Sequence, residues 1–180
     1  MLHALPADVV IDVETSRDDD DVEALNATTF GPGRHVRAAA RLRERGPHDR
    51  ALSFTARRGG GLVGSVRLTP IVVGGVPGHL LGPLAVVPAL KSLGIGRALI
   101  ERSCEAAAGT GGLFVLLVGD APYYERNGFA VVRGPLMPGP VDPARLLVRW
   151  HAGPAPLAGP VRHGLDATTP GEQPFQALTV

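Results

Sequence analysis

The stretch from Leu81 to Ala107 reads LGPLAVVPALKSLGIGRALIERSCEAA, and it decides the fold. Leu84 to Val87 are apolar in a row, as in a strand that is buried on both faces. Pro88 ends this strand because proline has no N–H for the ladder, and a short loop with Gly94 and Gly96 follows. After the loop, apolar residues recur at helical spacing, which predicts an amphipathic helix. The buried positions expected in this helix are Ile95, Leu99, Ile100, Cys104, Ala107 and Ala108.

A strand, a glycine loop and a helix in this order suit the binding of an anion. The first N–H groups of a helix have no partner within it, and the helix dipole adds a partial positive charge there. Glycines let a ligand come close to the backbone, and Lys91 adds a cation beside the loop. A diphosphate fits such a loop. Residue types alone leave a second interpretation open, in which the glycines only permit the turn.

Two blocks of sequence resemble the GNAT (GCN5-related N-acetyltransferase) superfamily, in particular its small bacterial members. The first block is Leu84-Ala85-Val86-Val87-Pro88 with Lys91-x-x-Gly94-x-Gly96, similar to the family's acetyl-CoA-binding strand and Gln/Arg-x-x-Gly-x-Gly/Ala loop. The second block, VGDAPYYERNGF from Val118 to Phe129, resembles the family's Tyr-x-x-x-Gly-Phe segment. The likeness extends over about residues 8 to 150 and is sharpest from 81 to 129.

The resemblance implies the GNAT fold, an α/β (α+β) architecture with a central mixed, largely antiparallel sheet and flanking helices. In that fold a central strand, here about His79 to Val87, carries a bulge and splays from a parallel neighbour, here Leu113 to Val118. The pantetheine arm of acetyl-CoA binds in the gap. Pro83 fits this expectation, because a proline inside a strand indicates a bulge or a local edge.

The resemblance also implies the residues of the site. Tyr124 stands at the tyrosine of Tyr-x-x-x-Gly-Phe, so it is expected to be the general acid that protonates the CoA sulfur. A phenol carries its proton at neutral pH, which suits this role, although Tyr124 could instead only pack or contact the pantetheine. The residues expected to bind acetyl-CoA are Leu84, Ala85, Val86, Lys91, Ser92, Leu93, Gly94, Ile95, Gly96, Arg97, Asp120 and Tyr123.

The loop departs from the family pattern at three positions. Many members carry Gln or Arg where Lys91 stands, and Gly followed by Arg or Lys where Ser92 and Leu93 stand. Lys91 keeps the positive charge but loses planar bidentate contact. We expect binding through the glycines and the helix N-terminus, with help from Arg97, and weakened by these changes.

No residue is identified as the general base. Asp120 follows a buried strand, where it could act as a base or cap the next short helix, which is the interpretation we prefer. His79 and His35 can titrate near neutrality, but a surface histidine without a role is the commoner outcome for each. A water relay could also take the proton of the amine.

Composition narrows the other possibilities. A net charge of +1 over 180 residues gives no reason to expect nucleic acid or membrane partners. A single cysteine, Cys104, excludes an internal disulfide, and no spacing of His, Cys and carboxylates indicates a metal site. The N-terminal segment lacks the pattern of a secretory signal, so we expect a cytoplasmic protein.

The remaining elements follow from apolar periodicity and turn residues. An acidic run, Asp18 to Asp21, is expected to charge the N-terminus of a helix, with attraction of a cationic amine as the alternative. Arg34, Arg37, Arg41 and Arg45 are expected on one helix face, either solvated or attracting an acidic group. Asp142-Pro143 leaves a short helix open as an alternative to the last strand. We expect helices at 22–30, 34–45 and 122–127, and strands at 9–14, 51–57, 62–73, 129–133 and 145–151.

The chain is predicted to form one GNAT acetyltransferase domain, residues 1–152, followed by a Pro/Gly-rich tail, residues 153–180. We expect the tail to be irregular and to pack in part through Leu157, Val161 or Phe175.

The leading hypothesis is an acetyl-CoA-dependent N-acetyltransferase whose acceptor is a small-molecule or peptide amine. An acyl-CoA-binding or interaction module without catalysis is the alternative, which the altered Ser92-Leu93 pair favours. A substrate other than an amine, or a longer acyl donor, is a third. A homodimer is compatible with the family.

Overall fold

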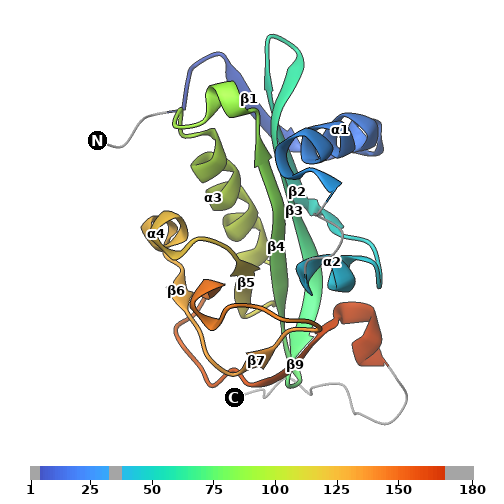
Figure 1. The fold of residues 1–180 in the computed structure, drawn as a ribbon, viewed down its shortest axis with the longest axis vertical. Coiled ribbons are helices and arrows are strands. Elements are labelled where there is room, and N and C mark those ends of the chain that lie inside the picture. Colours follow the sequence, from blue (N-terminus) through green and yellow to red (C-terminus); the bar gives the residue numbers. More distant parts are fainter. Residues whose placement is uncertain (1–4, 33–37, 169–180) are drawn as a thin grey trace.

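The structure, a computed structural model, describes residues 5–32 and 38–168. A twisted sheet runs through the molecule, with helix α3 on one face and helices α1 and α2 on the other (Figure 1). The strands are β1 (Val9–Val13), β2 (Asp49–Arg58), β3 (Gly61–Val73), β4 (Val76–Val86), β5 (Phe114–Val118), β6 (Ala130–Val131), β7 (Pro135–Leu136), β8 (Leu146–Trp150) and β9 (Gly159–His163). The α-helices are α1 (Asp19–Phe30), α2 (Ala38–Arg43), α3 (Ile95–Ala108) and α4 (Ala121–Tyr124). Short 3₁₀ turns are η1 (Ser16–Asp18), η3 (Pro88–Leu90), η4 (Glu125–Asn127), η5 (Pro143–Arg145) and η6 (Gly164–Thr168).

The sheet has the strand order β1-β2-β3-β4-β5-β8-β6. Neighbours along this path are antiparallel except β4 and β5, which are parallel because α3 crosses between them. The mixed, largely antiparallel sheet predicted from the sequence is therefore confirmed.

Strands β4 and β5 part soon after they meet. They pair only at His79 with Val115 and at Leu80 with Leu116. Beyond this point β4 bulges, because its register against β3 slips by one residue between Leu81 and Leu84. The bulge predicted from Pro83 is confirmed, and it lies where the two parallel strands separate.

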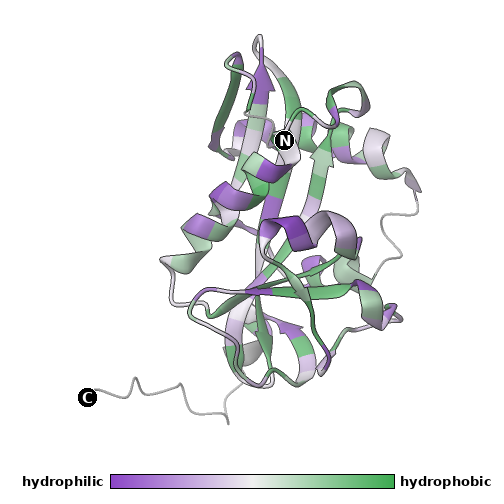
Figure 2. Cartoon of the chain, turned by 90° about the vertical axis from the view of Figure 1, so that its left-hand side faces the viewer, coloured by the Kyte–Doolittle hydropathy of each residue, from purple (hydrophilic) through white to green (hydrophobic). Residues whose placement is uncertain are grey.

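Helix α3 packs its apolar side against β2, β3 and β4 and so forms one half of the core. It begins and ends as predicted, and hydrophilic residues follow its outer side (Figure 2). The prediction for Ala108 was wrong: it is exposed, because it is the last residue of the helix. Ser103, one turn after Leu99, takes the additional buried position.

Near the N-terminus the elements differ from the prediction in extent. Helix α1 begins at Asp19 rather than Val22, so three residues of the acidic run lie in its first turn. Acidic side chains favour that position because of the helix dipole. The hairpin of β2 and β3 is longer than expected at both ends. Within the second helix, Arg34, His35 and Arg37 lie outside the described residues.

The segment after β5 contains the predicted short helix, divided into α4 and η4 and ended by Gly128 in the left-handed conformation. The strand expected at 129–133 is only two residues long, as β6. After Asp142, the short helix and the last strand, which the sequence left open as alternatives, both form, one directly after the other. The Asp142 side chain accepts a hydrogen bond from the Ala144 N–H to start η5, and β8 follows.

The tail expected to be irregular contains a strand. Strand β9 pairs with Ile71 to Val73 of β3. Strand β2 pairs with the same edge of β3 only as far as Leu68, so the rest of this edge is open to β9. Leu157 and Val161 are buried in a second apolar cluster with β4, β5 and β8, and Phe175 lies outside the described residues. In the part of the chain that the structure describes, no helix is both long and apolar enough to cross a membrane.

Replacing Leu157 with Ala tests the integration of this tail into the core. Leu157 is 5% exposed, so its truncation should destabilise the fold by about 2–4 kcal/mol, because it leaves a cavity. The measurement is the free energy of unfolding from urea titration. Leu136→Ala is the control, since Leu136 is 64% exposed and its truncation should have little effect. Equal effects of the two substitutions would contradict the packing.

Candidate active site

The edge of β4 that faces the gap presents polar backbone groups. The Val87 N–H donates to Val63 O of β3 at 2.9 Å, so the backbone groups of Val87 point toward β3. Because these groups alternate along a strand, those of Leu84 and Val86 point away from β3, toward the gap. Ala85, between them, points its groups at β3 opposite Ser65. Two of the three predicted strand residues can thus offer hydrogen bonds to a ligand in the gap.

The loop before α3 leads the helix N-terminus out to the surface. Gly94 is the N-cap residue with φ of 80°, and the first helical hydrogen bond runs from the Ala98 N–H to Gly94 O at 3.0 Å. The N–H groups of Ile95, Gly96 and Arg97 precede that bond and point out of the helix. This geometry fits a diphosphate at the helix N-terminus.

Ser92 is the one non-glycine residue with positive φ, at 72°, in the described parts of the chain. This conformation crowds the Cβ of an L-residue and costs about 1 kcal/mol relative to glycine. The position at which the family pattern has glycine is thus one at which the backbone of this chain itself favours glycine.

Tyr123 lies across the start of α3. Its hydroxyl is so close to Gly96 that a Cβ built at this glycine would stand 2.6 Å from it. Burial raises the pKa of the Tyr123 phenol, which therefore keeps its proton at neutral pH. Because residue 96 is glycine, the Tyr123 hydroxyl can come close to the start of α3, and Tyr123 lies beside the predicted diphosphate site.

Tyr124 turns inward beside Tyr123. Its ring packs edge-to-face on Phe129 at 5.9 Å between centroids, and it lies against Gly119, where any side chain would collide with it. Burial raises the pKa of the Tyr124 phenol well above its usual value, so the hydroxyl is protonated across the physiological range.

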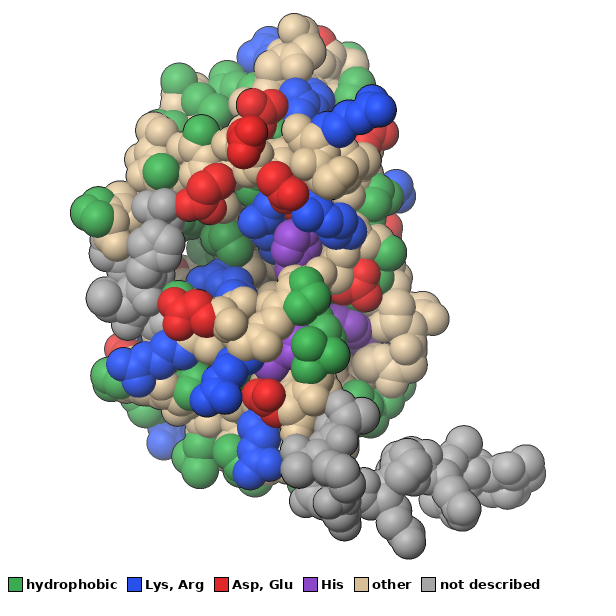
Figure 3. All heavy atoms as spheres, turned by 90° about the vertical axis from the view of Figure 1, so that its right-hand side faces the viewer, with side chains coloured by type: hydrophobic (Ala, Val, Ile, Leu, Met, Phe, Trp, Pro, Cys, Tyr) green, Lys and Arg blue, Asp and Glu red, His purple; other side chains and the backbone are tan. Residues whose placement is uncertain are grey.

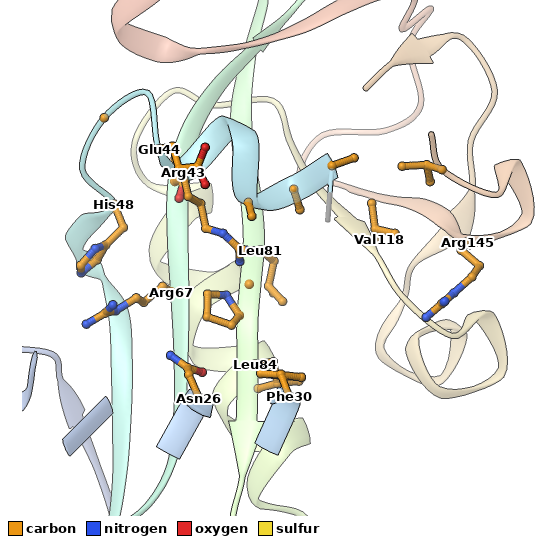
Figure 4. A pocket seen from close by; sticks show the side chains of 18 of the residues that line it. Asn26, Phe30, Arg43, Glu44, His48, Arg67, Leu81, Leu84, Val118 and Arg145 are labelled. Carbon is orange, nitrogen blue, oxygen red and sulfur yellow. The ribbon is translucent and has the colours of Figure 1, made fainter. Parts of the chain in front are cut away.

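Tyr124 also lines a pocket of about 640 Å³ on the α1 and α2 side of the sheet. Figure 4 shows Leu81 and Leu84 on β4, Arg67 and His48 on one side, and Val118 and Arg145 on the other. Helix α1 contributes Asn26 and Phe30. The pocket thus extends from the gap between β4 and β5 to the face of β3 that lies away from α3.

A network of charged side chains borders the β3 end of the pocket through His48 and Arg67. The fully buried carboxylate of Glu14 receives the Arg67 Nη2–H at 2.7 Å and also bonds His48 Nε2 at 3.0 Å. Arg50 bridges Glu14 and Asp19, and Arg67 reaches Asp19 as well. Acidic, basic and histidine side chains lie close together on this face (Figure 3). Because two carboxylates, Glu14 and Asp19, are paired with two arginines, Arg50 and Arg67, the network is close to neutral.

Pairing fixes the charge of these carboxylates. Burial raises the pKa of Glu14, but hydrogen bonds from His48 and Arg67 outweigh it and leave the pKa below its usual value. A hydrogen bond from Arg50 lowers the pKa of Asp19. In the same acidic run, Asp18 pairs with Arg57. These pairs account for much of the acidic run, which the sequence left open as an attraction site for an amine.

Two of the candidate bases, Asp120 and His79, lie apart from the pocket. Asp120 is exposed and occupies the preferred position as N-cap residue of α4, but its side chain makes no capping bond to any described residue, so the expected side-chain cap was wrong. Its carbonyl accepts from the Tyr123 and Tyr124 N–H groups instead. His79 is buried at the other end of β4, where burial lowers its pKa, and His35 is outside the described residues.

Comparison with known proteins places this geometry in a family. Residues 49–131 match a family model described as an acetyltransferase (GNAT) domain. The chain is 32% identical over 121 residues to the uncharacterized N-acetyltransferase YjhQ of Escherichia coli K12, over 65% of this chain and 67% of that protein. The chain belongs to the GNAT acetyltransferase family.

Solved GNAT structures share the whole fold. YhbS of Escherichia coli, in complex with CoA, matches with a TM-score of 0.71 and 26% identity, over 89% of this chain and 93% of that one. A GNAT acetyltransferase of Brucella melitensis, in complex with acetyl-CoA, matches with a TM-score of 0.65 and 26% identity, over 86% and 95%. The GNAT fold expected from the sequence is confirmed.

The sequence motifs of this GNAT protein did not reveal the β3 end of the pocket. His48 lies before β2, Arg67 and Thr69 lie on β3, and Glu14, which holds the first two, follows β1; none of them belongs to a motif. One signal was available: Arg67 and Thr69 alternate with apolar Val66 and Leu68, and such alternation places them on the face away from the α3 core.

Ser92→Gly should stabilise the protein by about 0.5–1 kcal/mol, because the relief of backbone strain exceeds the added entropy of the unfolded chain. The shift in the urea midpoint measures it. Ser92→Ala is the matched control and should give no gain, because alanine keeps the Cβ. A gain with alanine equal to that with glycine would contradict the strain.

Glu14→Gln should destabilise the protein by about 3 kcal/mol at neutral pH, because it leaves Arg67 without its buried counterion. The pKa of Glu14 is lower in the folded state, so its contribution is present above the unfolded value of about 4.5 and is lost as pH falls through the folded pKa. Unfolding free energies measured from pH 7 to pH 3 should therefore converge for the two proteins. A constant difference would show that the pairing has no such role.

Proposed function

We propose that the protein is an acetyl-CoA-dependent N-acetyltransferase that acetylates a primary amine by direct attack in a ternary complex. One observation carries the proposal: a single pocket is bordered both by Leu84, at the splayed edge of β4, and by Tyr124. An acceptor in this pocket lies beside the strand expected to hold the thioester and the phenol expected to serve the leaving group.

The residues present fit acetyl-CoA. Backbone groups of Leu84 and Val86 face the gap, where the amide groups of a pantetheine arm can pair with them. The outward N–H groups at the start of α3 fit the diphosphate, and Lys91 and Arg97 are exposed cations on either side of them. When bound, acetyl-CoA supplies an acyl group activated as a thioester.

The step needs three things from the chain. The pocket must hold a neutral amine near the gap, and backbone N–H groups of β4 polarise the acyl carbonyl. As the amine nitrogen forms its bond to the acyl carbon, the C–S bond breaks, and the thiolate takes the proton of the Tyr124 hydroxyl. The amine loses its own proton to water, and water returns a proton to Tyr124.

Tyr124 suits an acid that must arrive protonated. Its raised pKa keeps the phenol neutral, and its ring is fixed by Phe129 and Gly119. A thiolate, with a reference pKa of about 8.5, is a weaker base than a phenolate, so the transfer from Tyr124 is uphill and is completed by the proton that water returns to Tyr124. The rigid packing orients the hydroxyl, which is what an acid of this kind requires.

Tyr124→Phe should lower the rate of acetyl transfer at least tenfold while the affinity for acetyl-CoA changes little. The ring and its packing remain, and only the proton donor is lost. Transfer is measured as free CoA thiol over a panel of amines, and affinity by titration calorimetry with acetyl-CoA and with free CoA.

Tyr123→Phe is the matched control, because the Tyr123 hydroxyl lies over Gly96 at the start of α3 and has no part in the proposed proton transfer. It should change the affinity for acetyl-CoA rather than the rate at saturation. Unchanged turnover in Tyr124→Phe would remove the acid assignment. Binding of acetyl-CoA without transfer to any amine would favour the acyl-CoA-binding module instead.

A further inference from the structure

We propose that the β3 end of the pocket selects acceptors that carry a neutral hydrogen-bonding group, a carboxamide or a hydroxyl, and that Asn26 and Thr69 bind it. The assignment of this pocket to the acceptor rests on the proposed function. The selection itself rests on two buried polar side chains, each with an oxygen atom that has no hydrogen-bond partner among the described residues.

Asn26 is 3% exposed and Thr69 is fully buried, and both line the pocket. Asn26 Oδ1 and Thr69 Oγ1 have no hydrogen-bond partner among the residues that the structure describes. Leaving such a group unpaired costs about 1–3 kcal/mol, and most buried polar groups in proteins are paired. Two of them at one pocket indicate that a ligand supplies the missing partners.

The fold sets both side chains at this wall. Along β3, Val66 and Leu68 belong to the core under α3, so Arg67 and Thr69 face the opposite side of the sheet. Asn26 comes from the buried side of α1, which packs against β3 and β4. Figure 4 shows Asn26 beside Arg67 on the pocket wall.

Charge balance distinguishes a neutral group from an anion. Arg67 is already paired with Glu14 and Asp19, so this wall offers no uncompensated cation to a carboxylate. A carboxamide supplies an N–H for Asn26 Oδ1 and a carbonyl for the Thr69 hydroxyl. A hydroxyl can serve either atom, whereas a carboxylate, which only accepts, would leave Asn26 Oδ1 unpaired.

The β4 residues of the pocket indicate the middle part of the expected acceptor. Leu81, Pro83 and Leu84 of β4 are apolar and lie between the β3 wall and Tyr124. An acceptor would therefore direct its amine toward Tyr124 and pass a short apolar linker over β4. Its neutral polar group would then reach Asn26 and Thr69.

The test uses Thr69→Val, which removes the hydroxyl and keeps the shape. Without ligand, the variant should unfold about 2–4 °C higher than the wild type, because it no longer buries an unpaired hydroxyl. A drop in unfolding temperature would overturn the proposal, since it would show that the hydroxyl holds the fold together.

Binding is measured by calorimetry on the CoA-saturated protein, which requires no turnover. The probes are 5-aminopentanamide, 5-aminopentanoate and hexylamine, which share a four-carbon aminoalkyl chain and end in a carboxamide, a carboxylate and an ethyl group. The wild type should bind 5-aminopentanamide at least tenfold more tightly than either of the others, and Thr69→Val should abolish this preference. Tighter binding of 5-aminopentanoate, or no preference, would overturn the proposal.

Ser103→Ala is the matched control, because Ser103 is also fully buried, has an unpartnered hydroxyl and lies on α3, away from the pocket. It should leave the preference for 5-aminopentanamide intact. The two proposals can fail separately. A preference without acetyl transfer would refute the transferase function alone, and transfer without the preference would refute the selection alone.

Discussion

The structure depends on the early separation of β4 from β5. Two residue pairs join the strands, and the bulge at Gly82 and Pro83 then turns β4 away. The backbone groups of Leu84 and Val86 are left facing a gap, where unpaired peptide groups are costly unless water or a ligand meets them. The same separation lets Tyr124 reach the pocket from the end of β5, so the expected thioester site and the proposed acceptor pocket adjoin.

The second constraint is the charged network around Glu14. Buried ion pairs add little net stability compared with apolar packing, but losing one partner is costly. Glu14 directly follows β1, and its carboxylate holds Arg67 of β3 and His48 of the loop before β2 in place. Asp19 of α1 also pairs with Arg67 and so joins α1 to the network. The network therefore fixes the position of the pocket's β3 wall relative to α1.

Local features were predictable from the sequence, and contacts between distant segments were not. Helix α3 follows from its glycines and its apolar period, and the bulge from Pro83, because each signal lies within a few residues. Strand β9 was missed, since Gly159 and Pro160 argue against a strand and its partner Ile71 lies far away in the chain. The acceptor side was missed for the same reason: Asn26 and Thr69 are ordinary residues until the fold brings them to one wall.

The changed loop illustrates how a motif can vary while its geometry persists. The N–H groups that point outward at Ile95, Gly96 and Arg97 are placed by the start of α3, whatever side chain precedes them. The strain at Ser92 is present with or without a ligand as long as the loop keeps its shape, so it lowers stability without lowering affinity. Relative to the family pattern, Lys91 gives up bidentate contact and Leu93 gives up one positive charge. The departure from the family pattern therefore bears on the strength of diphosphate binding at the proposed site, and the outward N–H groups persist.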